Sequence, residues 1–190
     1  MCPDGVEHPT SSAWRNEAWA AHDGRVLVLR PMASTDMDTA RAFIRNLSFG
    51  SRYFRFGRGD IDFDDDALRS VCAADALTNT HLVVVTNDDP SNVVIAASAR
   101  YVVQDDGESC VFGLVVADAW QGEGLGRRLM QALIDSARGR GLKVMRGEVL
   151  ASNARMLGFL QKMGFDMEET AERWPSVRKL SLRLEPGNDA

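Results

Sequence analysis

Three glycines separated by single residues, Gly122, Gly124 and Gly126, stand between an apolar run and a helical pattern. The apolar run covers residues 111–117 and predicts a buried strand, while the residues after Gly126 carry apolar side chains at helical spacing. Backbone N–H groups in the first turn of a helix lack intrahelical partners and carry the positive end of the helix dipole. Glycines let a bulky anion approach those groups without meeting a Cβ. The pattern therefore predicts a phosphate-binding site.

The charge around these glycines agrees with an anionic ligand. Residues 121–146 contain six basic and two acidic side chains, a local charge of +4, whereas the whole chain of 190 residues carries −5. The rest of the chain therefore sums to −9, so positive charge is concentrated beside the predicted site. We expect a polyphosphate ligand there.

The glycine spacing distinguishes between kinds of phosphate site. A dinucleotide-binding G-x-G-x-x-G motif would need a glycine at position 127, which is arginine. A P-loop would need a Gly-Lys-Ser/Thr sequence, which the chain lacks. A nucleotide-dependent oxidoreductase is thus a remote alternative, and the pattern that remains is Q-x-x-G-x-G at residues 121–126.

The segments around the motif alternate between strand-like and helix-like patterns. Helices are expected from Ser34 or Asp36 to residue 47, at residues 64–74, between Gly126 and Gly141, and at residues 153–163. Strands are expected at residues 25–30, 81–86, 93–104, 111–117, 142–150, 167–171 and 177–184. The predicted fold is α/β, with a mixed, mostly antiparallel central sheet and flanking helices in the order β-α-α-β-β-β-α-β-α-β-β. This domain covers residues 25–185, between an N-terminal arm of residues 1–24 and a C-terminal tail of residues 186–190.

Composition limits the class of protein. With 45% hydrophobic and 26% charged residues, the chain predicts one globular domain with a sizeable core. Three scattered cysteines without an export signal indicate a reducing, cytoplasmic location. No apolar stretch approaches the ~18 residues of a membrane span, and the three histidines show no ligand spacing. We expect no metal, membrane or nucleic-acid partner, and we leave a homodimer open.

Four fragments resemble one family. The loop at residues 121–126 resembles the acyl-CoA loop of the GNAT N-acetyltransferases, as do residues 116–122, 148–153 and the Lys-Met-Gly-Phe sequence at 162–165. The order of predicted elements is also similar to that family's. Residues 46–56 resemble a segment of bacterial Pat-type protein lysine acetyltransferases. The resemblance implies an enzyme that transfers an acyl group, acetyl in the simplest case, from acyl-CoA to a primary amine. Tyr53-Phe-Arg-Phe favours a protein lysine over a small amine as the acceptor.

The resemblance also assigns the coenzyme A site. The pyrophosphate is expected on the loop amides, and the extended pantetheine arm can pair with the edge of the strand before the loop, like an added strand. The Asn153 side chain is expected to contact the pantetheine arm. An asparagine at this position is also typical of a helix N-cap. The predicted cofactor-binding residues are Leu114, Val115, Val116, Gln121, Gly122, Glu123, Gly124, Leu125, Gly126, Arg127 and Asn153.

The catalytic residues are less clearly indicated. A free lysine amine has a pKa of about 10.4, so transfer requires a base, and the developing oxyanion requires a donor such as a strand N–H near Val115 or Val116. The tyrosine common in the family aligns with Leu160, and a Pat-type glutamate aligns with Val111; neither side chain exchanges protons. Glu148 matches a glutamate base of some N-terminal acetyltransferases, so it is the candidate base, unless it is paired with an arginine and water serves instead.

Two alternatives follow from the same residues. The absence of the usual proton donor and base at Leu160 and Val111 is compatible with a non-catalytic acyl-CoA-binding or regulatory module. The acidic residues 60–66 either steer a cationic amine toward an acceptor groove or form a solvated loop that leads into a helix.

Overall fold

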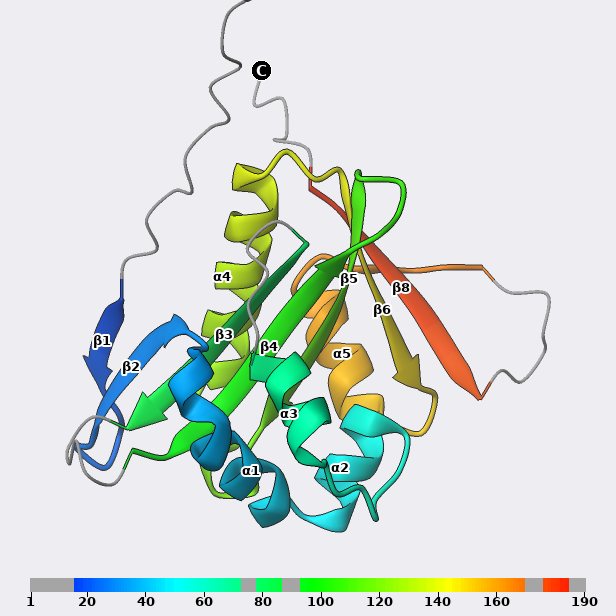
Figure 1. Cartoon of the computed structure of the whole chain (residues 1–190). Helices are drawn as coiled ribbons and strands as arrows, with labels where there is room; N and C mark the ends of the chain where they lie inside the picture. The colour runs from blue at the N-terminus through cyan, green and yellow to red at the C-terminus, as the bar shows by residue number, and fades with distance from the viewer. Residues whose placement is uncertain (1–15, 73–77, 87–92, 170–175, 185–190) are drawn as a thin grey trace, which may run out of the picture.

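The computed structural model describes residues 16–72, 78–86, 93–169 and 176–184 (Figure 1). The strands of this part form one sheet in the order β1-β2-β3-β4-β5-β6-β8-β7. They are β1 (Glu17–Ala20), β2 (Val26–Pro31), β3 (Asn79–Thr86), β4 (Ile95–Val103), β5 (Ser109–Val116), β6 (Val144–Leu150), β7 (Asp166–Met167) and β8 (Val177–Arg183). The helices are α1 (Met37–Asn46), α2 (Phe49–Phe56), α3 (Asp65–Cys72), α4 (Leu125–Gly139) and α5 (Ala154–Lys162), with 3-10 turns η1 (Ser34–Asp36) and η2 (Asp118–Trp120).

One pair of neighbouring strands differs from the others. β5 and β6 are parallel, and they pair only from Ser109 with Val144 to Val111 with Arg146. Beyond Val111, β5 continues along β4 while β6 continues along β8, so the two strands separate (Figure 1). All other pairs are antiparallel. The predicted mixed, mostly antiparallel α/β sheet is confirmed.

Helices cover both faces of the sheet (Figure 1). On one face α4 and α5 bury residues such as Leu129, Leu133 and Leu160, and on the other face α1 and α3 bury residues such as Phe43 and Leu68. Strand β3 lies between these layers, so its alternate residues enter both cores, which explains its continuous Leu-Val-Val-Val run. None of the described helices is both long and apolar enough to cross a membrane.

Two elements add to the predicted order. Residues 49–56 form α2, which begins at Ser48, whose hydroxyl accepts a hydrogen bond from the Ser51 N–H at 3.2 Å, and ends at Gly57 with φ of 75°. Residues 17–20, within the predicted arm, form β1 against β2. Residues 1–15 of the arm and the predicted tail lie outside the described residues.

Candidate active site

The separation of β5 from β6 leaves part of the β5 backbone without a strand partner. Gln104 N–H donates to Ser109 O, and Ala117 N–H donates to Ala96 O. Because hydrogen bonding alternates along an antiparallel pair, the odd-numbered residues from 109 to 117 direct their backbone groups toward β4. The N–H and C=O groups of Leu114 and Val116 consequently point into the gap beyond the last β5–β6 pair. Val115 directs its backbone groups toward Ser98 of β4 instead. The gap therefore offers alternate backbone donors and acceptors to an extended ligand.

The glycine loop lies at the end of this gap. Gly122 and Gly124 have φ of 96° and 79°, backbone angles that residues with a side chain rarely adopt. Gly124 is the N-cap of α4. Within the described residues, none of the backbone N–H groups from position 122 to position 126 donates a hydrogen bond. Five consecutive free N–H groups at a helix start form an anion-binding surface.

Polar side chains fix the loop against α2. The Asp118 carboxylate accepts hydrogen bonds from the Ser48 N–H at 2.8 Å, the Ser48 hydroxyl at 2.7 Å and the Ser51 hydroxyl at 2.8 Å. Partial burial opposes ionisation, but these hydrogen bonds outweigh it and lower the pKa of Asp118. These hydrogen bonds join the start of α2 to the loop that follows β5.

Gln121 connects the loop to both walls of the gap. Its side-chain Nε2 donates to Val116 O at 3.2 Å and to Ser51 Oγ at 3.4 Å, while its Oε1 accepts from Arg155 at 2.6 Å. Asn153 caps α5, because its Oδ1 accepts from the Met156 N–H at 3.1 Å. The Asn153 side-chain NH₂ makes no hydrogen bond within the described residues, and Asn153 lines the same cavity as Gln121.

A cavity of about 680 Å³ occupies the gap between β5 and β6 and the surface of the glycine loop. Residues of α2, α5 and β6 complete its walls, including Phe54, Met156 and Phe159. Of the predicted cofactor-binding residues only Glu123 is absent from its lining. The cavity brings together Leu114, Val115, Val116, Gln121, Gly122, Gly124, Leu125, Gly126, Arg127 and Asn153.

Glu148 lies on β6 and borders the same cavity. Its carboxylate is 3.8 Å from the Lys179 ammonium of β8, and both side chains are about two-thirds exposed, at 64% and 66%. The ion-pair partner is thus a lysine and not the arginine considered from the sequence. An exposed pair of this kind is weak, so it does not prevent Glu148 from accepting a proton.

The two tyrosines and Cys110 do not line this cavity. Leu160, at the family's tyrosine position, is fully buried in the core. Tyr101 is also fully buried, with its hydroxyl 3.2 Å from Ser136 of α4, and Tyr53 does not line the cavity. Burial raises the pKa of the Cys110 thiol to about 12, so this cysteine stays protonated near neutral pH.

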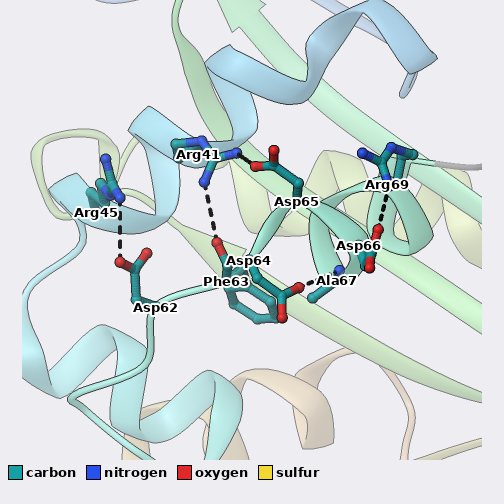
Figure 2. Close-up of polar contacts among 9 residues, drawn as sticks. All are labelled: Arg41, Arg45, Asp62, Phe63, Asp64, Asp65, Asp66, Ala67 and Arg69. Atoms are coloured by element: carbon teal, nitrogen blue, oxygen red, sulfur yellow. Dashed lines mark hydrogen bonds and ion pairs between the residues drawn. The ribbon is translucent and has the colours of Figure 1, made fainter.

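The acidic residues 60–66 form a loop that continues into the first two residues of α3, and their carboxylates are used locally (Figure 2). Arg41 binds Asp65, Arg45 binds Asp62 at 3.3 Å, and Arg69 binds Asp66. Asp64 accepts from the Ala67 N–H at 2.8 Å at the start of α3. None of these acidic side chains lines the cavity beside the glycine loop, so the arrangement favours the solvated loop over the steering of a cationic amine.

Sequence reasoning missed a group of basic residues beside the gap. A second cavity, of about 640 Å³, adjoins the first and is lined by Arg55 of α2, Arg100 of β4 and Arg146 of β6. These residues come from three separate elements, so no sequence spacing indicates them. Only the alternation of side chains along each strand, combined with the strand order, brings them to one face.

The family follows from similarity to known proteins. A model described as the acetyltransferase (GNAT) family matches residues 42–165. The chain belongs to this family. It is a GNAT N-acetyltransferase, and the residues matched by the family model include the glycine loop and the strands β5 and β6.

Three individual proteins illustrate the similarity. Acetyltransferase PA5475 of Pseudomonas aeruginosa is 32% identical over 144 residues, which cover 75% of this chain and 76% of that protein. The GNAT domain of S. lividans PAT has a TM-score of 0.77 at 22% identity, over 88% of this chain and 96% of that one. The yncA structure from Salmonella typhimurium, solved with its cofactor acetyl-CoA, has a TM-score of 0.67 at 24% identity, over 86% and 96%. The predicted likeness to GNAT and Pat-type domains is confirmed.

Proposed function

We propose that this GNAT enzyme transfers the acetyl group of acetyl-CoA to a primary amine. The observation that carries the proposal is one cavity that joins two features: the backbone of Leu114 and Val116, which has no strand partner on this side, and the free N–H groups of residues 122–126. The first suits a ligand with amide groups in an extended chain, and the second suits a pyrophosphate. Coenzyme A carries both groups in one molecule.

Basic side chains support the phosphate end. Arg127 lines the cavity at the start of α4 and makes no ion pair within the described residues. Its neighbour Arg128 is instead held by Glu17 of β1 at 2.6 Å and lies over the Trp19 ring at 4.5 Å. Arg127 is therefore the arginine of this pair that is free to bind a phosphate.

Acetyl-CoA would supply the acetyl group as a thioester, which a neutral amine attacks directly. The chain must then remove a proton from the amine and stabilise negative charge on the carbonyl oxygen. The N–H groups of Leu114 and Val116 are the donors that point into the gap. Two carboxylates border it, Glu148 and Asp118, and Asp118 already accepts three hydrogen bonds from Ser48 and Ser51. We assign Glu148 as the general base, acting directly or through water, and one of these two N–H groups as the donor to the carbonyl oxygen.

Calorimetry with acetyl-CoA and with CoA tests the cofactor, and release of free CoA thiol with a panel of amines tests transfer. Binding of both compounds, together with amine-dependent thiol release, is the expected result. No heat and no thermal shift at millimolar acetyl-CoA would refute the proposal. Binding and slow hydrolysis without transfer to any amine would favour a non-catalytic acyl-CoA-binding module, which Leu160 in place of a proton donor makes worth testing.

A further inference from the structure

The second cavity lies on the sheet face that α1 and α3 cover elsewhere. Tyr101 of β4 contacts Ser136 of α4, so its neighbour Arg100 points to the opposite face. The register pairs Arg100 with Gly113 of β5, and Val111, two residues before Gly113, with Arg146 of β6. These side chains therefore share one face, and the cavity that they line adjoins the gap between β5 and β6.

Arg55 stands where the two cavities meet, because it lines both of them together with Phe112, Gly113 and Glu148. A Cβ at position 113 would lie 2.5 Å from Nη2 and 2.6 Å from Cζ of Arg55. The absence of a side chain at Gly113 thus allows the guanidinium to lie directly on β5. Burial, and then the like charge of Arg100, lower the pKa of Arg55 to about 10.

The charge of the second cavity is not balanced within the described residues. Four basic side chains line it, Arg55, Arg100, Arg146 and Lys179, against two acidic ones, Glu148 and Glu168. The only ion pair among these six joins Lys179 to Glu148. The three arginines make no ion pair in the described part of the chain.

This arrangement contrasts with the arginines of the acidic loop. Arg41, Arg45 and Arg69 each face a carboxylate (Figure 2). Placing the positive charges of Arg55 and Arg100 near each other without a counter-ion costs free energy. An anion bound between them removes that cost. Guanidinium groups are suited to carboxylate and phosphate oxygens, which they bind through paired hydrogen bonds.

We propose that the acyl acceptor is an amine that also carries a carboxylate or phosphate group, and that Arg55 and Arg100, with Arg146, bind this anion. The inference rests on the proposed function. The acceptor's amine would lie toward Glu148, which borders both cavities, and its anion toward the arginines. An acceptor of this kind differs from an isolated protein lysine, which has no anion of its own.

Matched acceptors test the inference with the full-length protein. The pairs are L-leucine and L-leucinamide, β-alanine and β-alaninamide, and phosphoethanolamine and ethanolamine, compared by kcat/KM for thiol release from acetyl-CoA. In at least one pair the anionic member should be preferred by about tenfold or more, which corresponds to about 1.4 kcal/mol. A preference confined to the phosphate pair or to the carboxylate pairs identifies which anion is bound.

Variants connect any preference to the arginines. Arg100→Gln and Arg55→Gln should lower the ratio of kcat/KM for the anionic member to kcat/KM for the neutral member about tenfold or more. Arg58→Gln, an exposed arginine three residues after Arg55 that lines neither cavity, should leave both members unchanged. An equal loss of kcat/KM with the anionic and the neutral member would indicate a structural effect and count against the inference.

The two proposals fail in different ways. If CoA binds and the neutral amines have the same kcat/KM as the anionic ones, the proposed acceptor class is wrong, but acetyl transfer to a primary amine stands. If no amine is turned over, calorimetry of the same pairs with the CoA-loaded protein decides, and no binding of any anionic amine at millimolar concentration overturns the inference. Absence of CoA binding would refute the proposed function itself.

Discussion

The Asp118 carboxylate, on the loop after β5, accepts hydrogen bonds from both the N–H and the hydroxyl of Ser48, at 2.8 and 2.7 Å. Ser48 starts α2, the helix that carries Arg55. The loop that leads to the glycines and the helix that borders both cavities are thus joined through one carboxylate. A change at Asp118 should affect both.

Asp118→Asn should lower the free energy of unfolding by up to about 1 kcal/mol at pH 7, because an exposed carboxylate loses part of its charge-assisted hydrogen bonding. The pKa of Asp118 is lower in the folded state than in the unfolded state. Its contribution is therefore complete above the unfolded pKa of about 3.9 and is lost as pH falls through the folded pKa. Urea denaturation at pH 7, 5 and 3.5 should show the difference from the wild type unchanged between the first two and smaller at the third. Asp105→Asn, an exposed turn residue, is the control, and an equal loss there would contradict the assignment.

Arg127→Gln should weaken CoA binding about fivefold, or about 1 kcal/mol, because Arg127 lines the cavity without an ion pair in the described chain. The difference should shrink as salt rises, since the arginine is exposed. Calorimetry at two salt concentrations measures both effects. The matched control is Arg128→Gln, which removes a cation already held by Glu17 and should leave CoA affinity unchanged. Equal weakening in the two variants would argue for general attraction rather than a contact.

Gly113→Ala and Gly147→Ala should have different consequences. A Cβ at position 113 meets the flexible end of Arg55, whereas one at position 147 would lie 2.4 Å from the buried ring of Phe112. We expect Gly147→Ala to cost about 1–3 kcal/mol of stability through overpacking. Gly113→Ala should fold with little loss of melting temperature but raise KM for the anionic acceptor.

A double-variant cycle tests the cause of the Gly113→Ala effect. If displacement of Arg55 explains the raised KM, Gly113→Ala should add little to Arg55→Gln. Additive losses in KM would show that the glycine acts independently of the arginine.

Glu148→Gln should lower kcat about 10²-fold or more with the acceptor and leave the CoA dissociation constant unchanged, if the carboxylate is the general base. Stopped assays at saturating acetyl-CoA measure the first quantity and calorimetry the second. Glu108→Gln, which removes a carboxylate paired with Lys143, should change neither. An unaltered kcat in Glu148→Gln would assign proton removal to water.

Most strands and the long helix could be predicted because their patterns are local. The apolar run before the glycines and the helical spacing after them belong to contiguous residues, and so does the loop itself. Helix α2 was harder to predict because it has only eight residues, although its aromatic residues Phe49, Tyr53 and Phe56 have helical spacing. None of the eight is buried, and the ends of the helix depend on Ser48 and Gly57. β1 is four residues long and is defined by its pairing with β2 rather than by its own composition.

The two halves of the site differ in the same way. The loop amides come from consecutive residues, so spacing alone indicated an anion site. Arg55, Arg100 and Arg146 become neighbours only through the strand order β4-β5-β6 and the position of α2. The gap itself depends on the position at which β5 stops pairing with β6. No residue type in either strand predicts that position.

The meeting of the two cavities at Gly113 and Glu148 has a kinetic consequence. Each reactant has its own space, so neither must leave before the other enters, and a ternary complex can form. Initial-rate lines for varied acetyl-CoA at several fixed amine concentrations should then intersect. The acetyl group would pass from sulfur to nitrogen in one encounter, without residing on the protein.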